Sequence, residues 1–304
     1  MGFYFAHRSR TAGAFILWNA LVGEAFAAPC DDCNVVWIVV DTTRADYLGS
    51  LGADAPSTPN LDALAARGTL FSQAYAQAPA TMLSTSSYFS GRRRLNTGMD
   101  FDAFNREADF HPLSPQVTTV AEVLQGQGIR TRGVTANMLL SSTAKWNLEL
   151  YAGFETWESG NDALVEKRGI ALLDELKEEQ FFLYLHFMGP HIPNEELDGF
   201  AERRGAYPEG MPKVNNRTYG EMNKGRLTLS EQEQDYLRAL YADSLWQADG
   251  RVGRVLQHLE STGLQERTLV VVISDHGEAL GDEHLHKPVW GHGHALSEPL
   301  LHVP

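Results

Sequence analysis

Three short, continuous apolar runs constrain the fold of this chain more than any other feature. They span residues 35–40, 181–185 and 269–273 and are rich in Val, Ile, Leu and Phe. Runs of this length and composition are typical of strands that are buried on both faces of a sheet. Residues 129–135 form a fourth, weaker strand candidate. We therefore expect a central sheet that is covered on both sides.

Helical segments with readable end signals lie between the strand candidates. Thr58 and Gly68 bound one such segment, and capping-box patterns begin others at Thr119 and Ser230. The segment from Ser230 is the longest and carries one apolar stripe at helical spacing. The members of that stripe are Leu237, Leu240, Tyr241, Leu245, Ala248, Val252, Val255 and Leu259. Alternating strands and helices predict an α/β fold with a mostly parallel central sheet and helices on both faces.

Length and net charge limit the number of domains and the class of partner. The 304 residues are 43% hydrophobic, and no internal repeat, low-complexity tract or linker interrupts the sequence after residue 34. We expect one domain, residues 34–304. The formal net charge of −14 argues against nucleic acid and anionic lipid surfaces as partners, because both would be repelled. An anion that this protein binds must therefore meet a local cluster of positive charge.

The amino terminus has the layout of a secretory signal peptide. His7, Arg8 and Arg10 precede an apolar run at residues 12–22, and an A-x-A processing site follows at residues 25–27. The apolar run is too short to span a bilayer comfortably. We expect residues 1–27 to be removed on export to the periplasm or the medium, which leaves no integral membrane segment. The alternative is a buried amino-terminal helix.

The only two cysteines, Cys30 and Cys33, lie in the short segment of residues 28–33 that precedes the domain. In an oxidising compartment they could pair, ligate a metal or do neither. No cysteine further along the chain is available as a catalytic thiol.

Polar side chains suited to binding metals or anions follow three of the strand candidates. Asp41 and Arg44 follow the first, His191 follows the second, and Asp275 and His276 follow the third. One such aspartate would usually be a helix cap or a turn former. Ligands of parallel sheets, however, bind beyond the carboxyl ends of the strands. The three junctions together therefore predict a functional site at this edge of the sheet.

The sequences at these junctions resemble a known family. The segments NVVWIVVDTTRADYLGSLG, TPNLDALAARGTLFSQAYAQAP, FFLYLHFMGPHIP, RTLVVVISDHGEALGDEH and GHGHALSEPLLHVP occur in that order. They resemble the amino-terminal catalytic domain of the sulfatase branch of the alkaline phosphatase superfamily, over residues 34–304. The resemblance implies hydrolysis of an anionic ester at a bound metal. Relatives continue past the position of Pro304 into a further strand and a carboxy-terminal subdomain, which we expect this chain to lack.

The resemblance also implies roles for individual residues. Asp41, Asp275 and His276 correspond to ligands of a divalent cation. Thr81 corresponds to the nucleophile, which also touches the cation, because TMLSTSSYFSGR aligns with the nucleophile segment of the family. Ser84 falls on a matching serine. We expect the segment from Thr81 to form a helix whose first turn directs its amide groups toward the bound anion.

The nucleophile segment departs from the sulfatase pattern. A typical sulfatase has a cysteine that is converted to formylglycine at the position of Thr81, and threonine cannot undergo that conversion. Leu83, Thr85 and Thr42 also stand where sulfatases have proline, arginine and a second metal-binding aspartate. A threonine nucleophile is instead similar to phosphotransfer members of the superfamily, so the sequence leaves open whether the substrate is a sulfate or a phosphate ester.

The ligand set predicts one divalent cation. Oxygen ligands with one imidazole suit Ca, Mn or Zn, and the sequence does not choose among these metals. The Asp-x-x-x-His pattern of relatives with two zinc ions is missing near Asp243, where Gln247 stands four residues further on.

Further residues match positions of the family, but the sequence leaves more than one role open for some of them. Arg44 could balance negative charge on the transferred group, or it could form a structural salt bridge to Asp46. His191 and His292 are candidate donors to the ester or its leaving group, and Lys287 is a weaker candidate. Three further matching residues are expected to be structural, namely Asn137, Asp243 and Asp249.

The leading hypothesis is an exported, metal-dependent hydrolase of sulfate or phosphate esters that uses Thr81 at one divalent cation. Its substrate would be an anionic ester carried by a small molecule, a glycan or a lipid. One alternative keeps the site but transfers phosphate to an alcohol or cleaves a phosphodiester. Transferases of this kind are usually embedded in membranes, and no set of spanning helices is present in the sequence. The other alternative is a non-catalytic, truncated relative.

Overall fold

The computed structural model describes residues 32–54, 57–100, 111–144, 149–196, 198–205, 207–284 and 286–304. The expected signal peptide and Cys30 lie outside the described residues. In the part of the chain that is described, no helix is both long enough and apolar enough to cross a bilayer.

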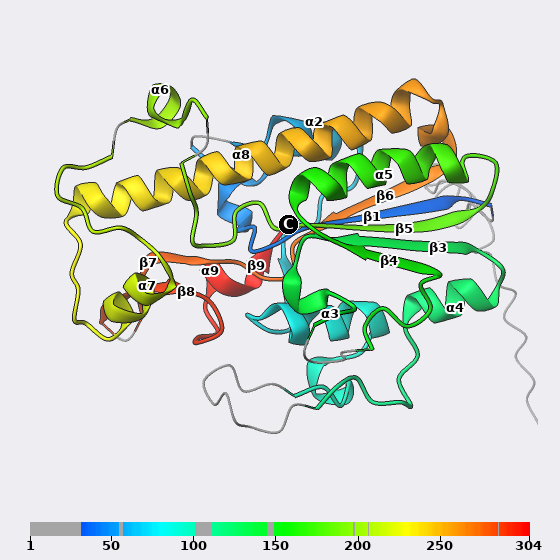
Figure 1. Cartoon of the computed structure of the whole chain (residues 1–304), viewed down its shortest axis with the longest axis horizontal. Helices are drawn as coiled ribbons and strands as arrows, with labels where there is room; N and C mark the ends of the chain where they lie inside the picture. Colours follow the sequence, from blue (N-terminus) through cyan, green and yellow to red (C-terminus); the bar gives the residue numbers. More distant parts are fainter. Residues whose placement is uncertain are drawn as a thin grey trace, which may run out of the picture.

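The centre of the molecule is a five-stranded sheet in which every strand pairing is parallel. The strand order is β4-β3-β5-β1-β6 (Figure 1). The bounds are β1 Asn34–Val40, β3 Arg130–Thr135, β4 Thr156–Ser159, β5 Phe181–Phe187 and β6 Thr268–Ile273. The predicted α/β fold and its parallel sheet are confirmed, and β4 is a strand that the sequence analysis did not predict.

Burial along the strands follows their position in the sheet. Every residue of β5 is buried, because a strand lies on each side of it and helices cover both faces. β6 lies at the edge beside β1, and Leu269 is 56% exposed. The expectation that residues 269–273 are buried on both faces was therefore wrong, since an edge strand has a neighbour on one side only.

Helices cover both faces of the sheet, as predicted (Figure 1). One face packs on α2 (Pro59–Arg67), α5 (Asp162–Leu176) and α8 (Glu231–Ser261), and the other packs on α3 (Thr81–Ser90) and α4 (Val120–Gly126). Side chains of β1 alternate between the two cores, as the two-residue period of a strand requires. Val36 and Ile38 belong to the core under α8, and Val39 belongs to the core under α3.

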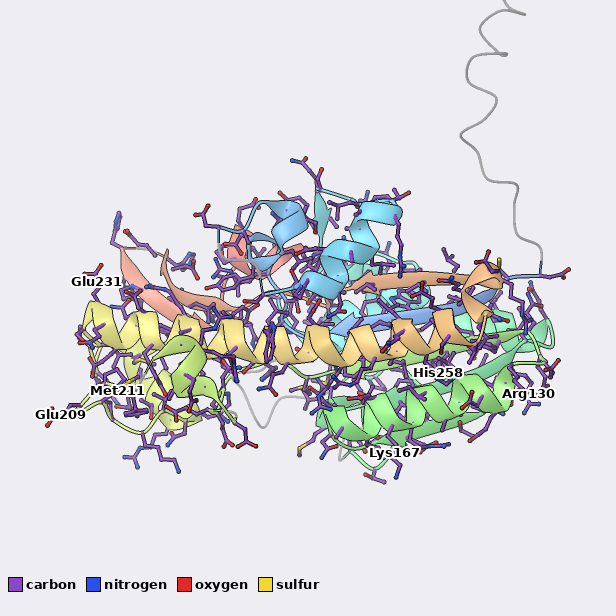
Figure 2. All side chains as sticks on the ribbon, turned by 90° about the horizontal axis from the view of Figure 1, so that it is seen from above. Arg130, Lys167, Glu209, Met211, Glu231 and His258 are labelled. Atoms are coloured by element: carbon purple, nitrogen blue, oxygen red, sulfur yellow. The ribbon has the colours of Figure 1, made fainter. Side chains whose placement is uncertain are left out.

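The long helix α8 spans two parts of the molecule. Both hydrogen bonds of the predicted capping box at Ser230 are present, and the eight members of the predicted apolar stripe are all buried. Figure 2 shows α8 running from Glu231 past His258 along the length of the molecule. Its carboxy-terminal half packs on the sheet, and its amino-terminal half packs on a smaller core. That smaller core is shared with α6 (Phe200–Arg204), α7 (Asn216–Asn223), β7 (Ala279–His284) and β8 (Lys287–Gly291).

The remaining elements are short. β2 (Ala74–Tyr75) pairs antiparallel with β9 (His302–Val303), which follows α9 (Glu298–Leu301). Single 3-10 turns occur at Ala45–Tyr47, Gly49–Leu51, Arg94–Asn96, Met138–Leu140 and Leu264–Arg267. The chain after β8 thus returns to the segment that follows the edge strand β6, where the Gly277 amide donates to the Leu300 carbonyl at 2.9 Å.

Candidate active site

The carboxyl ends of four parallel strands bring polar residues to one edge of the sheet. Asp41 follows β1, Asn137 follows β3, His186 lies near the end of β5, and Asp275 follows β6. All four side chains are buried. Parallel strands end at the same edge, so residues far apart in the sequence meet here.

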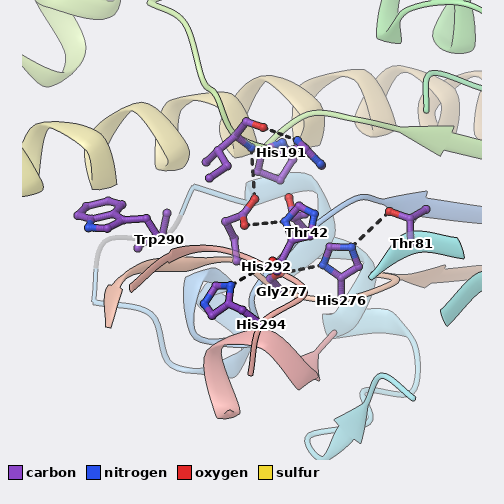
Figure 3. A network of polar contacts seen from close by, with 12 residues as sticks. Thr42, Thr81, His191, His276, Gly277, Trp290, His292 and His294 are labelled. Carbon is purple, nitrogen blue, oxygen red and sulfur yellow. Dashed lines mark hydrogen bonds and ion pairs between the residues drawn. The ribbon is translucent and has the colours of Figure 1, made fainter. Parts of the chain in front are cut away.

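Asp41, Asp275 and His276 form a compact cluster of metal-ligating type. One ligand atom from each lies within 4.8 Å of the others, and no other such group occurs among the described residues. Thr81, the first residue of α3, places its Oγ1 3.3 Å from His276 Nε2 (Figure 3). The structure therefore brings together the four residues that the sequence analysis assigned to the metal.

Each of the two carboxylates has one oxygen held by the protein and one without a hydrogen bond. Asn137 Nδ2 donates to Asp41 Oδ2 at 2.7 Å, and His186 Nε2 lies 3.0 Å from the same oxygen. The amides of Thr42 and His276 donate to Asp275 Oδ1 at 3.2 and 3.0 Å.

The second oxygen of each carboxylate, Asp41 Oδ1 and Asp275 Oδ2, is buried and has no hydrogen-bond partner among the described residues. Leaving a buried carboxylate oxygen unpaired is costly. A divalent cation would supply the missing partner for both oxygens, and the donor set of two carboxylates, one imidazole and one hydroxyl fits such an ion.

The charges around the cluster favour an ionised Asp41. Burial would raise the pKa of its carboxyl, but the hydrogen bond from His186 and the charges of His191, His186 and His276 outweigh burial and lower this pKa. Burial would lower the pKa of His186, but its contact with Asp41 raises it. The site thus holds a carboxylate ready to bind a cation.

Two histidines, His191 and His292, lie beside the metal cluster (Figure 3). The ring centroid of His292 lies 4.5 Å from that of His276 and 4.9 Å from that of His191. Its Nδ1 lies 2.8 Å from Oε1 of the buried Glu278, whose Oε2 accepts from the Ile192 amide at 3.3 Å. Burial would lower the pKa of His292, but the charge and hydrogen bond of Glu278 raise it to about 9.

Arg44 is bound to neighbouring protein groups. Its guanidinium forms paired hydrogen bonds of 2.9 and 2.7 Å with Asp46. It also donates to Asp282 at 2.7 Å and to the Glu278 carbonyl at 3.1 Å. The structure therefore contains the salt bridge to Asp46 that was the alternative to an anion-binding role.

Other residues singled out in the sequence lie away from the cluster. Lys287 is exposed on β8 and donates to the Asn223 carbonyl at 3.1 Å. Asp243 pairs with Arg203. Asp249 accepts from the amides of Asn60 and Leu61 at the start of α2. The structural roles predicted for Asp243 and Asp249 are confirmed.

The sequence analysis missed three residues of the site. It gave Asn137 a structural role alone. Asn137 does accept from the Leu139 amide, but its Nδ2 also donates to Asp41. His186 directly follows the strand candidate of residues 181–185 and was given no role, although a histidine between apolar residues is a signal. Glu278 belongs to the quoted segment SDHGE, where it was given no role.

Comparison with known proteins identifies relatives of this chain. It is 23% identical to an arylsulfatase of Klebsiella aerogenes, over 84% of this chain and 68% of that protein. It is 24% identical to iduronate 2-sulfatase of Homo sapiens, over 83% of this chain and 56% of that protein. The chain thus spans about half to two thirds of the length of the curated relatives that it matches.

Solved structures share the fold. A phosphonate monoester hydrolase of Agrobacterium radiobacter superimposes with a TM-score of 0.64 at 18% identity, over 90% of this chain and 67% of that one. At this identity the likeness shows the fold alone. The sulfatase family model, in contrast, matches residues 33–304, which is nearly the whole described chain. This protein therefore belongs to the sulfatase family, within the alkaline phosphatase superfamily.

Proposed function

We propose that this protein is a metal-dependent hydrolase of sulfate or phosphate esters in which Thr81 is the nucleophile. The observation that carries the proposal is the pair of buried carboxylate oxygens without partners, Asp41 Oδ1 and Asp275 Oδ2, beside the hydroxyl of Thr81 and the Nε2 of His276. Membership of the sulfatase family supports the reaction class.

The residues that would hold the metal are Asp41, Asp275, His276 and Thr81. One cluster of this type occurs among the described residues, which supports a single cation of Ca, Mn or Zn. A bound divalent cation would lower the pKa of the Thr81 hydroxyl and polarise the ester oxygens.

The position of Thr81 on α3 suits attack on a bound anion. No side chain caps the start of this helix, and Ala80 is its N-cap residue. The first amide groups of a helix have no partner within the helix, and they carry the positive end of its dipole. These amide groups would bind the sulfate or phosphate oxygens next to the attacking hydroxyl.

The reaction that we propose has two steps. In the first, the Thr81 hydroxyl releases its proton to solvent, its oxygen bonds to the sulfur or phosphorus and the bond to the ester oxygen breaks, which leaves a sulfo- or phospho-threonine. The departing oxygen takes a proton from His292 or His191. In the second step, water returns a proton to that histidine as its oxygen attacks the same sulfur or phosphorus. The bond to Thr81 breaks, and the Thr81 oxygen takes a proton from solvent.

Glu278 prepares His292 for the role of proton donor. The charge and hydrogen bond of Glu278 raise the pKa of His292 and so favour its protonated form. Because Glu278 holds Nδ1, the Nε2–H is the group that we assign to the leaving oxygen. His191, whose ring centroid lies 4.9 Å from that of His292, is the second candidate for this proton.

A second candidate function is phosphoryl transfer to an alcohol, or phosphodiester cleavage, at the same site. Threonine at the nucleophile position favours it, because that residue is similar to the phosphotransfer members of the superfamily. We also propose that the ester is carried by a small molecule, a glycan or a lipid. The protein would be exported after removal of residues 1–27.

The test combines metal content with activity on matched substrates. The purified protein is analysed for bound metals, and its hydrolysis of 4-nitrophenyl sulfate and 4-nitrophenyl phosphate is measured with and without added cation. We expect one divalent cation per chain and release of nitrophenol from at least one substrate. A protein with no metal and no activity on either ester would support the non-catalytic alternative. Phosphate turnover that rises with added alcohol would support transfer.

A further inference from the structure

A chain of hydrogen bonds, part-buried at Tyr88 and buried at His186, leads from α3 to Asp41. Thr85 Oγ1 lies 3.0 Å from the Tyr88 hydroxyl, which lies 2.7 Å from the Tyr184 hydroxyl. The Tyr184 hydroxyl is 2.8 Å from His186 Nδ1, and His186 Nε2 is 3.0 Å from Asp41 Oδ2. The side chains of Thr85, Tyr88, Tyr184 and His186 have no role in the proposed reaction.

The acceptor at the end of the chain determines the direction of the bond between His186 and Asp41. An ionised Asp41 can only accept, so His186 Nε2 donates to it in both the neutral and the protonated imidazole. In the neutral imidazole Nδ1 accepts from the Tyr184 hydroxyl, and in the imidazolium Nδ1 donates to that hydroxyl instead. In both states Asp41 Oδ2 receives the Nε2–H of His186.

Packing holds the middle of the chain in one place. Tyr184 is fully buried, its ring stacks on Trp157 with centroids 5.6 Å apart, and it meets Phe89 edge-on at 4.9 Å. His186 is also fully buried. Polar groups in such a core are tolerated when each has a partner, but apolar side chains would fill the same space at lower cost. The hydroxyl and imidazole groups therefore call for an explanation beyond packing.

We infer that His186 and Tyr184 are positioning residues that orient the Asp41 carboxylate, so that Oδ2 is held and Oδ1 faces the proposed metal site. The inference rests on the proposed function. The chain also starts one turn after Thr81 on α3, and Asn137 Nδ2 lies between Asp41 Oδ2 and Thr81 Oγ1, at 2.7 and 3.4 Å. Asp41 is thus connected to the helix of Thr81 in two ways, through Asn137 and through the chain of hydrogen bonds.

The test measures Mn²⁺ affinity of the chelator-stripped full chain by calorimetric titration, together with the melting temperature of the metal-free protein. His186→Leu removes the donor, and His186→Gln keeps an amide donor near the position of Nε2. Tyr184→Phe keeps the ring and removes the hydroxyl. Tyr236→Phe is the matched control, because it also removes a buried hydroxyl that donates to a carboxylate, that of Glu196, in a separate core.

We expect His186→Leu to weaken Mn²⁺ binding by about 10- to 100-fold, as loss of a group that orients a metal ligand usually does. His186→Gln should recover most of that loss, and Tyr184→Phe should fall between His186→Leu and the parent. Tyr236→Phe should bind Mn²⁺ like the parent even where its metal-free form melts lower.

Two results would overturn the inference. One is parental Mn²⁺ affinity in both His186→Leu and Tyr184→Phe, and the other is a parent that binds no divalent cation. Failure of the proposed function looks different: Mn²⁺ binding would depend on His186, but neither aryl ester would be hydrolysed. If His186→Leu does not fold, Tyr184→Phe decides the question, because it keeps the ring and removes only the hydroxyl; parental Mn²⁺ affinity in that variant would then overturn the inference.

Discussion

At the residue scale, changes to the Thr81 hydroxyl distinguish two roles of this residue, a nucleophile and a residue that only begins a helix. We expect Thr81→Ala to keep the fold and most of the metal affinity but to lose turnover by several orders of magnitude, because alanine has no oxygen to attack the ester. Thr81→Ser should retain measurable activity, since it keeps the hydroxyl. Turnover and melting temperature of both variants are the measurements.

A variant that melts lower but turns over normally would show that Thr81 is not the nucleophile. Ser84 and Ser86 would then be the next residues to test. Ser86 is the weaker of these, because its hydroxyl already donates to the Leu83 carbonyl at 2.8 Å.

A variant of Arg44 can show whether this buried arginine binds the substrate or stabilises the fold. Its guanidinium is bound to Asp46 and Asp282, so we expect Arg44→Met to lower the free energy of unfolding by about 1–3 kcal/mol. Denaturant titration measures this loss. The KM for an active ester should stay within about twofold of the parent value, because a guanidinium bound to Asp46 and Asp282 would not bind the ester. Loss of an ester contact worth 1.4 kcal/mol would instead raise the KM about tenfold. A large rise in KM at unchanged stability would instead support the anion-binding role.

At the scale of elements, one glycine allows the end of the chain to pack behind the metal cluster. A Cβ on Gly277 would lie 2.0 Å from the Pro299 carbonyl oxygen, so Gly277→Ala must displace α9 or the segment that carries His276. We expect a lower melting temperature and weaker Mn²⁺ binding. Gly250→Ala in α8 is the control, because its nearest neighbour would be Arg254 Nη1 at 3.7 Å. Alanine favours the helix there by up to about 1 kcal/mol. Equal melting temperatures of the two variants would contradict this account.

At the scale of the whole molecule, a bound cation should stabilise the fold. Two buried carboxylates repel each other without it, and any ligand that binds only the folded state raises stability. At a free cation concentration of 100 times Kd the gain is about 2.7 kcal/mol. We expect a chelator to lower the melting temperature by several degrees and added metal to restore it. An unchanged midpoint, with no metal found by elemental analysis, would refute the assignment of the ligands.

Export can be tested on the native protein. We expect mass spectrometry of the protein from the cell envelope fraction to find a chain that lacks residues 1 to about 27, because the charged start, apolar run and A-x-A site are read by signal peptidase. An intact Met1, or recovery of the protein from the cytoplasm, would contradict the prediction.

Local patterns in the sequence were sufficient to predict most of the elements. The strands at β1, β5 and β6 follow from continuous apolar runs, and α8 follows from an apolar stripe at helical spacing with a capping box at Ser230. The motifs that follow these strands also placed Asp41, Asp275 and His276 in one site, and the resemblance of the segment from Thr81 to the family's nucleophile segment added Thr81. These features are local, because strand and helix periods and end signals are written within a few residues.

Tertiary structure alone decided the rest, since it depends on neighbours that are distant in sequence. The exposure of β6 depends on its place at the edge of the sheet, which its own residues do not encode. Asn137 and His186 enter the site through hydrogen bonds to Asp41, which lies 96 and 145 residues away from them. The salt bridge of Arg44 forms because Asp46, Asp282 and the Glu278 carbonyl converge on its guanidinium. Hydrogen bonds over such separations exist only once the parallel strands have aligned their carboxyl ends.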